Sequence, residues 1–137
     1  MRDFRNLAVW RKAHNSVIAV YRATRGYPRD ELYGLTLQTR RAAVSVPANI
    51  AEGCGRATTA DFARFLDLAA GSANELEYHL LLACELRFLP ANEYDSLAAG
   101  IREVRQMLAS LTRRLREGRP TPRQRPTNNP NHYATDG

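Results

Sequence analysis

The strongest constraint on the fold is a run of apolar residues that recur at alternating steps of four and three in the middle of the chain. The run comprises Phe62, Leu66, Ala69, Ala73, Leu76, Leu80 and Ala83. Such steps keep side chains on one face of an α-helix, because the helix completes a turn about every 3.6 residues. Sustained over this length, the spacing is typical of helices that pack against other helices. The pattern therefore predicts one long buried helix within a helical assembly.

Three further segments show helical periodicity. The first helix is predicted from about Asn6 to Thr24, with an inward stripe made of Leu7, Trp10, Ala13, Val17 and Tyr21. The second is predicted from an N-cap at Asp30 to about Gly55. It contains Pro47, which removes one backbone hydrogen bond, so we expect a continuous helix with a bend.

The last two helices share the heptad spacing. The third is predicted to begin at a cap on Thr58 or Thr59. The fourth begins near Asn92, and its inward residues are Leu97, Ile101, Val104, Leu108, Leu111 and Leu115. Four helices joined by short connections predict an all-α, up-down-up-down antiparallel four-helix bundle. We expect the bundle to span residues 1–117, followed by a disordered Pro/Arg/Asn tail at 118–137.

A polar strip runs along the second predicted helix. Arg41, Ser45, Asn49, Glu52 and Arg56 recur at steps of four, four, three and four, and apolar or small residues flank the strip on both sides. A polar strip between two apolar flanks indicates a helix packed on two sides, and hence a bundle that assembles with copies of itself. We expect Ser72 and Glu75 of the third helix to meet it, since buried polar groups require partners. The predicted structural polar seam comprises Arg41, Ser45, Asn49, Glu52, Ser72 and Glu75, and its pairing within or between chains stays open.

The chain is basic, and almost all of its positive charge is arginine. Its formal net charge is +6, and Lys12 is the single lysine. Arginine binds phosphates through a planar fork and stacks on bases, so this usage favours a nucleic-acid partner. Codon bias in a GC-rich genome is the alternative explanation. Arg40 and Arg64 lie off the seam and off the apolar stripe, where they would add to a basic surface.

Motifs for catalysis or metal binding are absent from the sequence. No nucleophile elbow, Gly-rich phosphate loop or Glu-x-x-His pair occurs, so we expect no enzyme, no catalytic residue, no metal and no cofactor. Cys54 and Cys84 lie among apolar residues, as reduced thiols of a cytoplasmic protein would. No secretory leader and no membrane-spanning run is recognisable, so we expect no membrane partner.

Three stretches carry a resemblance to a known family. LAVWRKAH at 7–14, YPRDELYGLTLQTRRAAVSVPANIAEGCGR at 27–56 and DFARFLDLAAGSANELEYHLLLA at 61–83 closely resemble the four-helix-bundle proteins encoded within intervening sequences of bacterial large-subunit ribosomal RNA genes. The resemblance covers roughly residues 4–115. It implies a homo-oligomer, most simply a five-membered ring. A related branch is the accessory protein of diversity-generating retroelements, which resembles a basic pentamer that engages a reverse transcriptase and nucleic acid.

Together these observations predict a cytoplasmic, non-catalytic homopentamer that binds RNA or DNA through arginine. The candidate nucleic-acid residues are Arg40, Arg41, Arg56 and Arg64, of which Arg40, Arg41 and Arg56 match the family's signature stretch by similarity. The alternative function is an interaction scaffold for a protein such as a reverse transcriptase. No RNP-type or Gly-x-x-Gly reader module is present, so the sequence predicts no particular RNA sequence as target.

Overall fold

The computed structural model describes residues 2–118, and the expected tail at 119–137 lies outside the described residues. Within the described chain there are four long helices and no strands, which confirms the all-α prediction. The helices are α1 (Ala8–Thr24), α2 (Leu35–Cys54), α3 (Thr59–Glu85) and α4 (Ala91–Arg116). Two short 3-10 turns, η1 (Phe4–Asn6) and η2 (Arg29–Glu31), precede α1 and α2.

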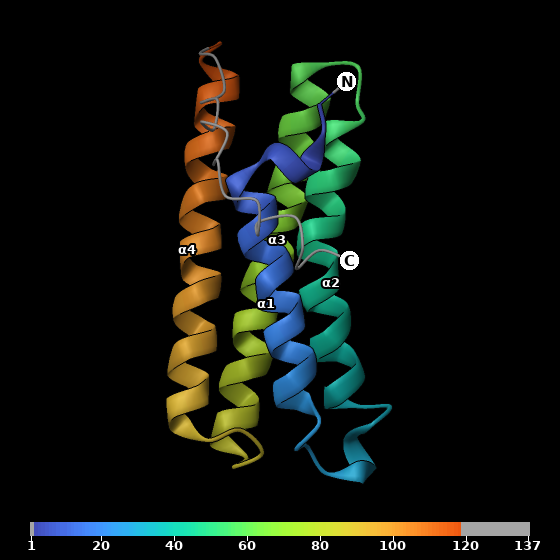
Figure 1. Cartoon of the computed structure of the whole chain (residues 1–137), viewed down its shortest axis with the longest axis vertical. Coiled ribbons are helices and arrows are strands. Elements are labelled where there is room, and N and C mark those ends of the chain that lie inside the picture. The colour runs from blue at the N-terminus through green and yellow to red at the C-terminus, as the bar shows by residue number, and fades with distance from the viewer. Residues whose placement is uncertain (1, 119–137) are drawn as a thin grey trace, which may run out of the picture.

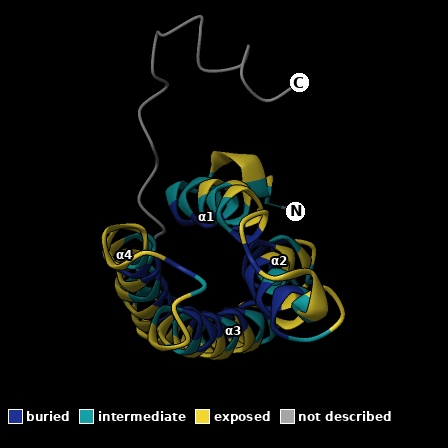
Figure 2. Cartoon of the chain, turned by 90° about the horizontal axis from the view of Figure 1, so that it is seen from below, coloured by how far each residue is buried: buried dark blue, intermediate teal, exposed yellow. Residues whose placement is uncertain are grey.

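The four helices enclose a single core. Figure 1 places the α1–α2 and α3–α4 connections at one end and the α2–α3 connection at the other, together with the N-terminus. Viewed end-on, α1 lies beside α2 and α4, α3 closes the ring, and the buried residues face inward (Figure 2). Every helix supplies fully buried side chains, such as Val20, Ile50, Phe62 and Leu108. Burial of each such side chain contributes roughly 1.5–3 kcal/mol.

The heptad prediction for α3 is confirmed. All seven residues of the run from Phe62 to Ala83 are at most 1% exposed. The helix begins with Thr58 as N-cap, whose hydroxyl accepts a hydrogen bond from the Asp61 amide. In α4 the predicted inward residues are likewise buried, except Leu97, which is half-buried. The α3–α4 core is therefore the part of the bundle that its sequence specifies most strongly.

The predicted start of the second helix is wrong. Asp30 does not cap α2, because residues Arg29–Glu31 form the separate turn η2 and α2 begins only at Leu35. The Glu31 carboxylate accepts a hydrogen bond from the Leu35 amide at 2.9 Å. Glu31, rather than the predicted Asp30, thus satisfies a backbone amide at the start of α2. The helix continues through Pro47 to Cys54, as predicted.

The buried face of α1 is rotated from the predicted stripe. Its buried residues are Val9, Ala13, Val20 and Thr24, whereas Tyr21 is 41% exposed. The buried face is turned about the axis of α1, relative to the predicted stripe, by less than the ~100° that separates successive residues. Large side chains lie at the flanks of the helix, and the small Ala13 and Thr24 occupy the centre, so hydrophobicity alone misplaced the face.

The α3–α4 turn contains an unusual backbone conformation. Arg87 has φ of 64°, in the left-handed region that normally favours glycine. The Phe88 amide donates to the Ala83 carbonyl at 2.9 Å, and the Arg87 amide donates to the Cys84 carbonyl at 3.0 Å. These bonds close the end of α3 in the manner of a Schellman cap. Within the described residues, no helix is both long and apolar enough to cross a membrane.

Candidate nucleic-acid interface

Part of the predicted polar seam forms hydrogen bonds within one chain. Ser45 of α2 and Ser72 of α3 face each other with 2.8 Å between their hydroxyl oxygens. The Asn49 side-chain amide donates to the Ser45 carbonyl at 2.8 Å and to the Ser45 hydroxyl at 3.0 Å. All three residues are partly buried. The Ser45–Ser72 bond joins α2 to α3, whereas the two Asn49 bonds lie within α2 and hold the Ser45 side chain.

The charged residues of the seam lie at the surface. Glu52 forms an ion pair with Arg56 at 2.6 Å, one turn along α2, and its side chain is 56% exposed. Glu75 lies 3.7 Å from the buried His79, one turn along α3. Arg41 is exposed and forms no ion pair with any residue of the described chain. The structure therefore joins Ser45, Asn49 and Ser72, and leaves Arg41, Glu52 and Glu75 outside that network.

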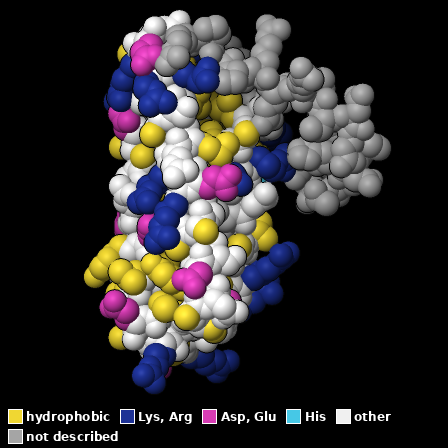
Figure 3. Space-filling model, turned by 90° about the vertical axis from the view of Figure 1, so that its left-hand side faces the viewer, with side chains coloured by type: hydrophobic (Ala, Val, Ile, Leu, Met, Phe, Trp, Pro, Cys, Tyr) yellow, Lys and Arg dark blue, Asp and Glu magenta, His cyan; other side chains and the backbone are white. Residues whose placement is uncertain are grey.

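The two apolar flanks of the strip differ in burial. Ala42, Val46 and Ile50 on one flank belong to the core, whereas Val44 is 41% exposed and Ala48 is exposed on the other. A further row of exposed apolar side chains follows α3, including Leu68 at 46% and Tyr78 at 60%. Figure 3 shows one such apolar patch in the lower half of the face formed by α4 and α3. No other part of the described chain buries these apolar side chains of α2 and α3.

Arg40, a predicted nucleic-acid residue, is engaged within the bundle. Its Nε donates to the Thr24 hydroxyl at 2.9 Å, and its guanidinium lies over the Tyr21 ring at 4.7 Å. Thr24 is buried, and its hydroxyl also donates to the Val20 carbonyl at 2.8 Å. Arg40 thus ties α2 to the end of α1, and its geometry is that of a structural residue.

Arg56 and Arg64 meet on one aromatic ring. The guanidinium carbon of Arg56, after the end of α2, lies 4.5 Å from the centroid of Phe65, and that of Arg64 on α3 lies 4.6 Å from it. Glu52 holds Arg56 at 2.6 Å, and Asp61 holds Arg64 at 3.1 Å. The ring and the carboxylates therefore fix both guanidiniums in position at the bundle surface.

Three more arginine–aromatic pairs lie toward the end of the bundle that holds the N-terminus and the α2–α3 connection (Figure 1). These pairs were not predicted from the sequence. Arg2 lies over Phe62 at 4.4 Å, Arg5 over Phe4 at 4.6 Å and Arg11 over Trp10 at 5.3 Å. The signal was present in the first residues, where arginine and aromatic residues alternate. We call the set the Arg–aromatic end, and it comprises Arg2, Phe4, Arg5, Trp10, Arg11, Arg56, Phe62, Arg64 and Phe65.

A close approach between helices supports this end. A Cβ atom on Gly53 would lie 2.9 Å from the ring of Phe62 and 2.9 Å from Cβ of Phe65. Only glycine therefore allows the last turn of α2 to come so near to α3. This contact brings Phe65 within reach of Arg56.

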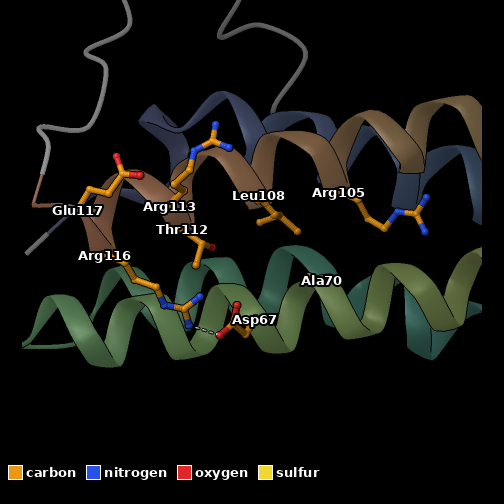
Figure 4. Close-up of a pocket in the computed structure, with 9 residues that line it drawn as sticks. Asp67, Ala70, Arg105, Leu108, Thr112, Arg113, Arg116 and Glu117 are labelled. Carbon is orange, nitrogen blue, oxygen red and sulfur yellow. Dashed lines mark hydrogen bonds and ion pairs between the residues drawn. The ribbon is translucent and has the colours of Figure 1, made fainter.

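A groove between α3 and α4 adjoins the same end. Its volume is about 490 Å³, and its lining includes Asp67, Ala70, Leu108, Thr112 and Arg116. Leu108, Thr112 and Arg116 extend from α4 toward α3, where Arg116 binds Asp67 at 2.5 Å (Figure 4). Asp67 offsets the charge of Arg116 in this groove, as Glu52 and Asp61 do for Arg56 and Arg64, and the groove lacks the aromatic rings of the Arg–aromatic end.

The other arginines of α4 divide into two groups. Arg102 and Arg105 both bind Glu77 of α3, at 3.1 and 3.3 Å, and therefore join the two helices. Arg113 and Arg114 occupy the last turn, where a cation also offsets the negative end of the helix dipole. Lysine and arginine side chains are spread along this side of the molecule from end to end, with acidic and apolar side chains between them (Figure 3).

Reactive and metal-binding groups are sparse in the described chain. No cluster of three or more His, Cys, Asp or Glu side chains that could hold a metal ion occurs within residues 2–118. Burial raises the pKa of the Cys54 thiol, and the charge of nearby Arg2 partly opposes this shift. A buried thiol with a raised pKa is a poor nucleophile at neutral pH.

The fold and this surface define a class, namely small helical bundles with a basic, arginine-rich exterior. The chain belongs to the family of 23S rRNA-intervening sequence proteins, whose family model matches residues 5–110. This confirms the resemblance seen in the sequence.

A solved structure shares the fold. The crystal structure of a protein of unknown function from the S23 ribosomal protein family of Bacteroides thetaiotaomicron superposes with a TM-score of 0.70 at 25% identity. The match covers 77% of this chain and 98% of that one. No functionally curated protein matches the chain significantly.

Proposed function

We propose that this protein is a non-catalytic, cytoplasmic bundle that binds nucleic acid, and specifically RNA, through the Arg–aromatic end. The observation that carries the proposal is the grouping of five arginines over four aromatic rings at one end of the molecule. Guanidinium groups bind phosphates, and both they and aromatic rings stack on exposed bases. The net charge of +6 and the family's association with ribosomal RNA genes support it.

Fluorescence anisotropy with structured RNA and duplex DNA tests this proposal. Binding that neutralises several phosphates weakens steeply as salt increases, because condensed counterions are released. We expect micromolar or tighter binding at low salt, with a steep negative slope of log affinity against log salt. A variant that carries Arg2→Gln, Arg5→Gln and Arg64→Gln should lower both the affinity and the slope.

A matched control removes charge elsewhere. Arg22→Gln, Arg25→Gln and Arg29→Gln change the same number of charges at the opposite end of the bundle. Equal loss of affinity in the two triple variants would reduce the interaction to net charge and refute the assignment to the Arg–aromatic end. No binding by the wild-type protein, even at low salt, would refute the nucleic-acid proposal itself.

We further propose that the four helices run up-down-up-down and that copies of the bundle assemble into a homo-oligomer. The expected form is a five-membered ring. The exposed apolar flank of α2 at Val44 and Ala48, together with Leu68 of α3, supports a second packing surface. A ring would repeat each basic group around its axis and thereby raise the avidity for a polyanion. Native mass spectrometry should report five chains, and Ala48→Arg should yield folded monomers. An unchanged oligomer for Ala48→Arg, or a monomeric wild type, would refute this surface.

The alternative function is a scaffold for a protein partner such as a reverse transcriptase. The exposed apolar side chains of Tyr78, Leu81 and Leu86, in the last turns of α3 and at its C-cap, favour it, because exposed apolar patches are typical of protein interaction sites. Co-expression with a reverse transcriptase encoded beside the gene, followed by co-purification, tests this function. Tyr78→Ser and Leu81→Ser should abolish the complex, whereas Arg5→Gln should not.

A further inference from the structure

The Phe65 ring and the two guanidiniums over it form a compact surface cluster. Arg56 and Arg64 come from different helices, and their guanidinium carbons lie 4.5 and 4.6 Å from the ring centroid. The arginine side chains are 38% and 59% exposed, whereas Phe65 is only partly exposed. Each guanidinium thus contacts the Phe65 ring and one carboxylate, and each arginine side chain is also partly open to solvent.

The carboxylates of the cluster hold the guanidiniums without covering them. Glu52 binds Arg56 through one terminal nitrogen, and Asp61 binds Arg64 through Nε. Both carboxylates thus bind N–H groups at the edge of the guanidinium plane, which leaves its flat face available. A planar cation fixed in this way loses little entropy when a flat partner stacks on it.

We propose that this cluster, Arg56–Phe65–Arg64, is a stacking site for unpaired nucleobases, so that the protein binds single-stranded segments of RNA in preference to duplex. The proposal rests on the proposed function and adds the form of nucleic acid and the residues that select it. Bases in a duplex are covered by their neighbours, whereas unpaired bases in loops and ends stack on aromatic rings and on guanidinium planes. The two bound carboxylates also lower the net charge of the cluster, so flat stacking rather than phosphate attraction is its distinctive contribution.

A charge-conserving exchange tests the site. The double variant Arg56→Lys and Arg64→Lys keeps both positive charges but removes the planar groups. Binding is measured by anisotropy to a single-stranded RNA and to the blunt duplex of the same length, at matched salt. We expect the wild-type protein to prefer the single strand, and the lysine variant to lose about tenfold or more in affinity for it, the scale of one or two stacked bases. The duplex affinity and the salt slope should stay unchanged.

Two further variants separate stacking from folding. Phe65→Leu removes the ring that supports both arginines and should also lower the preference for the single strand. Arg102→Lys is the matched control, because Arg102 is ion-paired to Glu77 and has no ring beneath it among the described residues. Thermal unfolding of all variants, with melting temperatures near that of the wild type, excludes loss of fold as the cause.

The outcomes distinguish this site from the general function. Equal affinity of the wild-type protein for single strand and duplex, or an undiminished preference in the lysine variant, overturns the stacking site while leaving nucleic-acid binding in place. No binding to either RNA overturns the proposed function and the site together.

Discussion

The hydroxyl oxygens of Ser45 on α2 and Ser72 on α3 lie 2.8 Å apart, and this hydrogen bond joins the two helices within one chain. Asn49 donates to the same Ser45 hydroxyl and to its carbonyl. Part of the polar strip therefore pairs within one chain, and part of it does not. Its Ser45 pairs with Ser72 across α2 and α3 and Asn49 bonds to Ser45 within α2, whereas its charged residues remain at the surface.

The serine pair should show measurable coupling. Ser45→Ala or Ser72→Ala each removes one partner and leaves a partly buried hydroxyl with fewer bonds, so we expect a loss of about 1 kcal/mol in unfolding free energy. The double variant should cost less than the sum of the two, because neither hydroxyl is then left behind. Urea denaturation of the wild-type protein, the two single variants and the double variant measures this coupling. Ser96→Ala, at an exposed position of α4, is the control and should change little.

Gly53 should not tolerate a side chain. Alanine there would bring its Cβ within 2.9 Å of both Phe62 and Phe65, and Phe62 is fully buried and cannot move aside. We expect Gly53→Ala to destabilise the bundle by about 1–3 kcal/mol. Gly71→Ala is the opposite case, because nothing lies within 4 Å of a Cβ built there. It should stabilise α3 by about 0.5–1 kcal/mol through helix propensity. Equal effects in denaturant melts would contradict the close approach at Gly53.

Glu31 should matter to the start of α2, and its neighbour should not. Glu31→Ala leaves the Leu35 amide without its 2.9 Å acceptor and should cost about 0.5–2 kcal/mol, the range of a lost helix cap. Asp30 is exposed and forms no hydrogen bond or ion pair with the described chain, so Asp30→Ala should be nearly neutral. Amide hydrogen exchange of the first turn of α2 should rise for Glu31→Ala alone. The reverse ranking would restore the aspartate as the cap.

Tyr27 should make the bundle sensitive to alkali. Burial, with added repulsion from Glu93 and Cys84, raises the pKa of Tyr27 from 10.0 to about 12. Because the raised value belongs to the folded state, its contribution to stability is complete below pH 10.0 and is lost as the pH rises toward about 12. Tyr27→Phe should therefore flatten the decline of unfolding free energy across this interval. Urea midpoints at several pH values, compared between the two proteins, measure the effect.

At neutral pH the same substitution has a second expected result. The Tyr27 hydroxyl is buried and has no hydrogen-bond partner among the described residues. Tyr27→Phe should therefore be neutral or slightly stabilising there, because no bond is lost. A clear loss of stability at neutral pH would show that the hydroxyl is satisfied in solution, for instance by a bound water.

The heptad of α3 shows why so much of the fold follows from the sequence. The regular alternation of four and three places the residues of this run on one face of the helix. Phe62, Leu66 and Leu80 can therefore be assigned to the core without reference to the other helices. The errors arose where side-chain length or size decided the outcome. Asp30 falls in the separate turn η2, and the Glu31 carboxylate accepts the hydrogen bond from the Leu35 amide instead. Tyr21 lies at the flank of α1, where the Arg40 guanidinium lies over its ring.

The candidate interface was less accessible to sequence reasoning, since it depends on contacts between distant segments. Nothing in the spacing of Arg56 and Arg64 indicates that both would lie over Phe65. The pairing of Arg2 with Phe62 likewise joins the start of the chain to α3, sixty residues away in the sequence. Arg40 illustrates the converse. The sequence predicted it as part of a basic surface, whereas its Nε donates to the Thr24 hydroxyl of the neighbouring α1.

The even number of helices has a practical consequence for engineering. The first described residues and the end of α4 lie at the same end of the bundle, the one with the α2–α3 connection (Figure 1). A fluorophore or affinity tag attached directly to residue 2 or residue 118 would therefore lie beside the Arg–aromatic end and obstruct it (Figure 1). A circular permutant that links residue 118 to residue 2 and opens the chain between Arg87 and Leu89 would carry its new termini to the far end, which leaves the basic surface clear for immobilisation and binding assays.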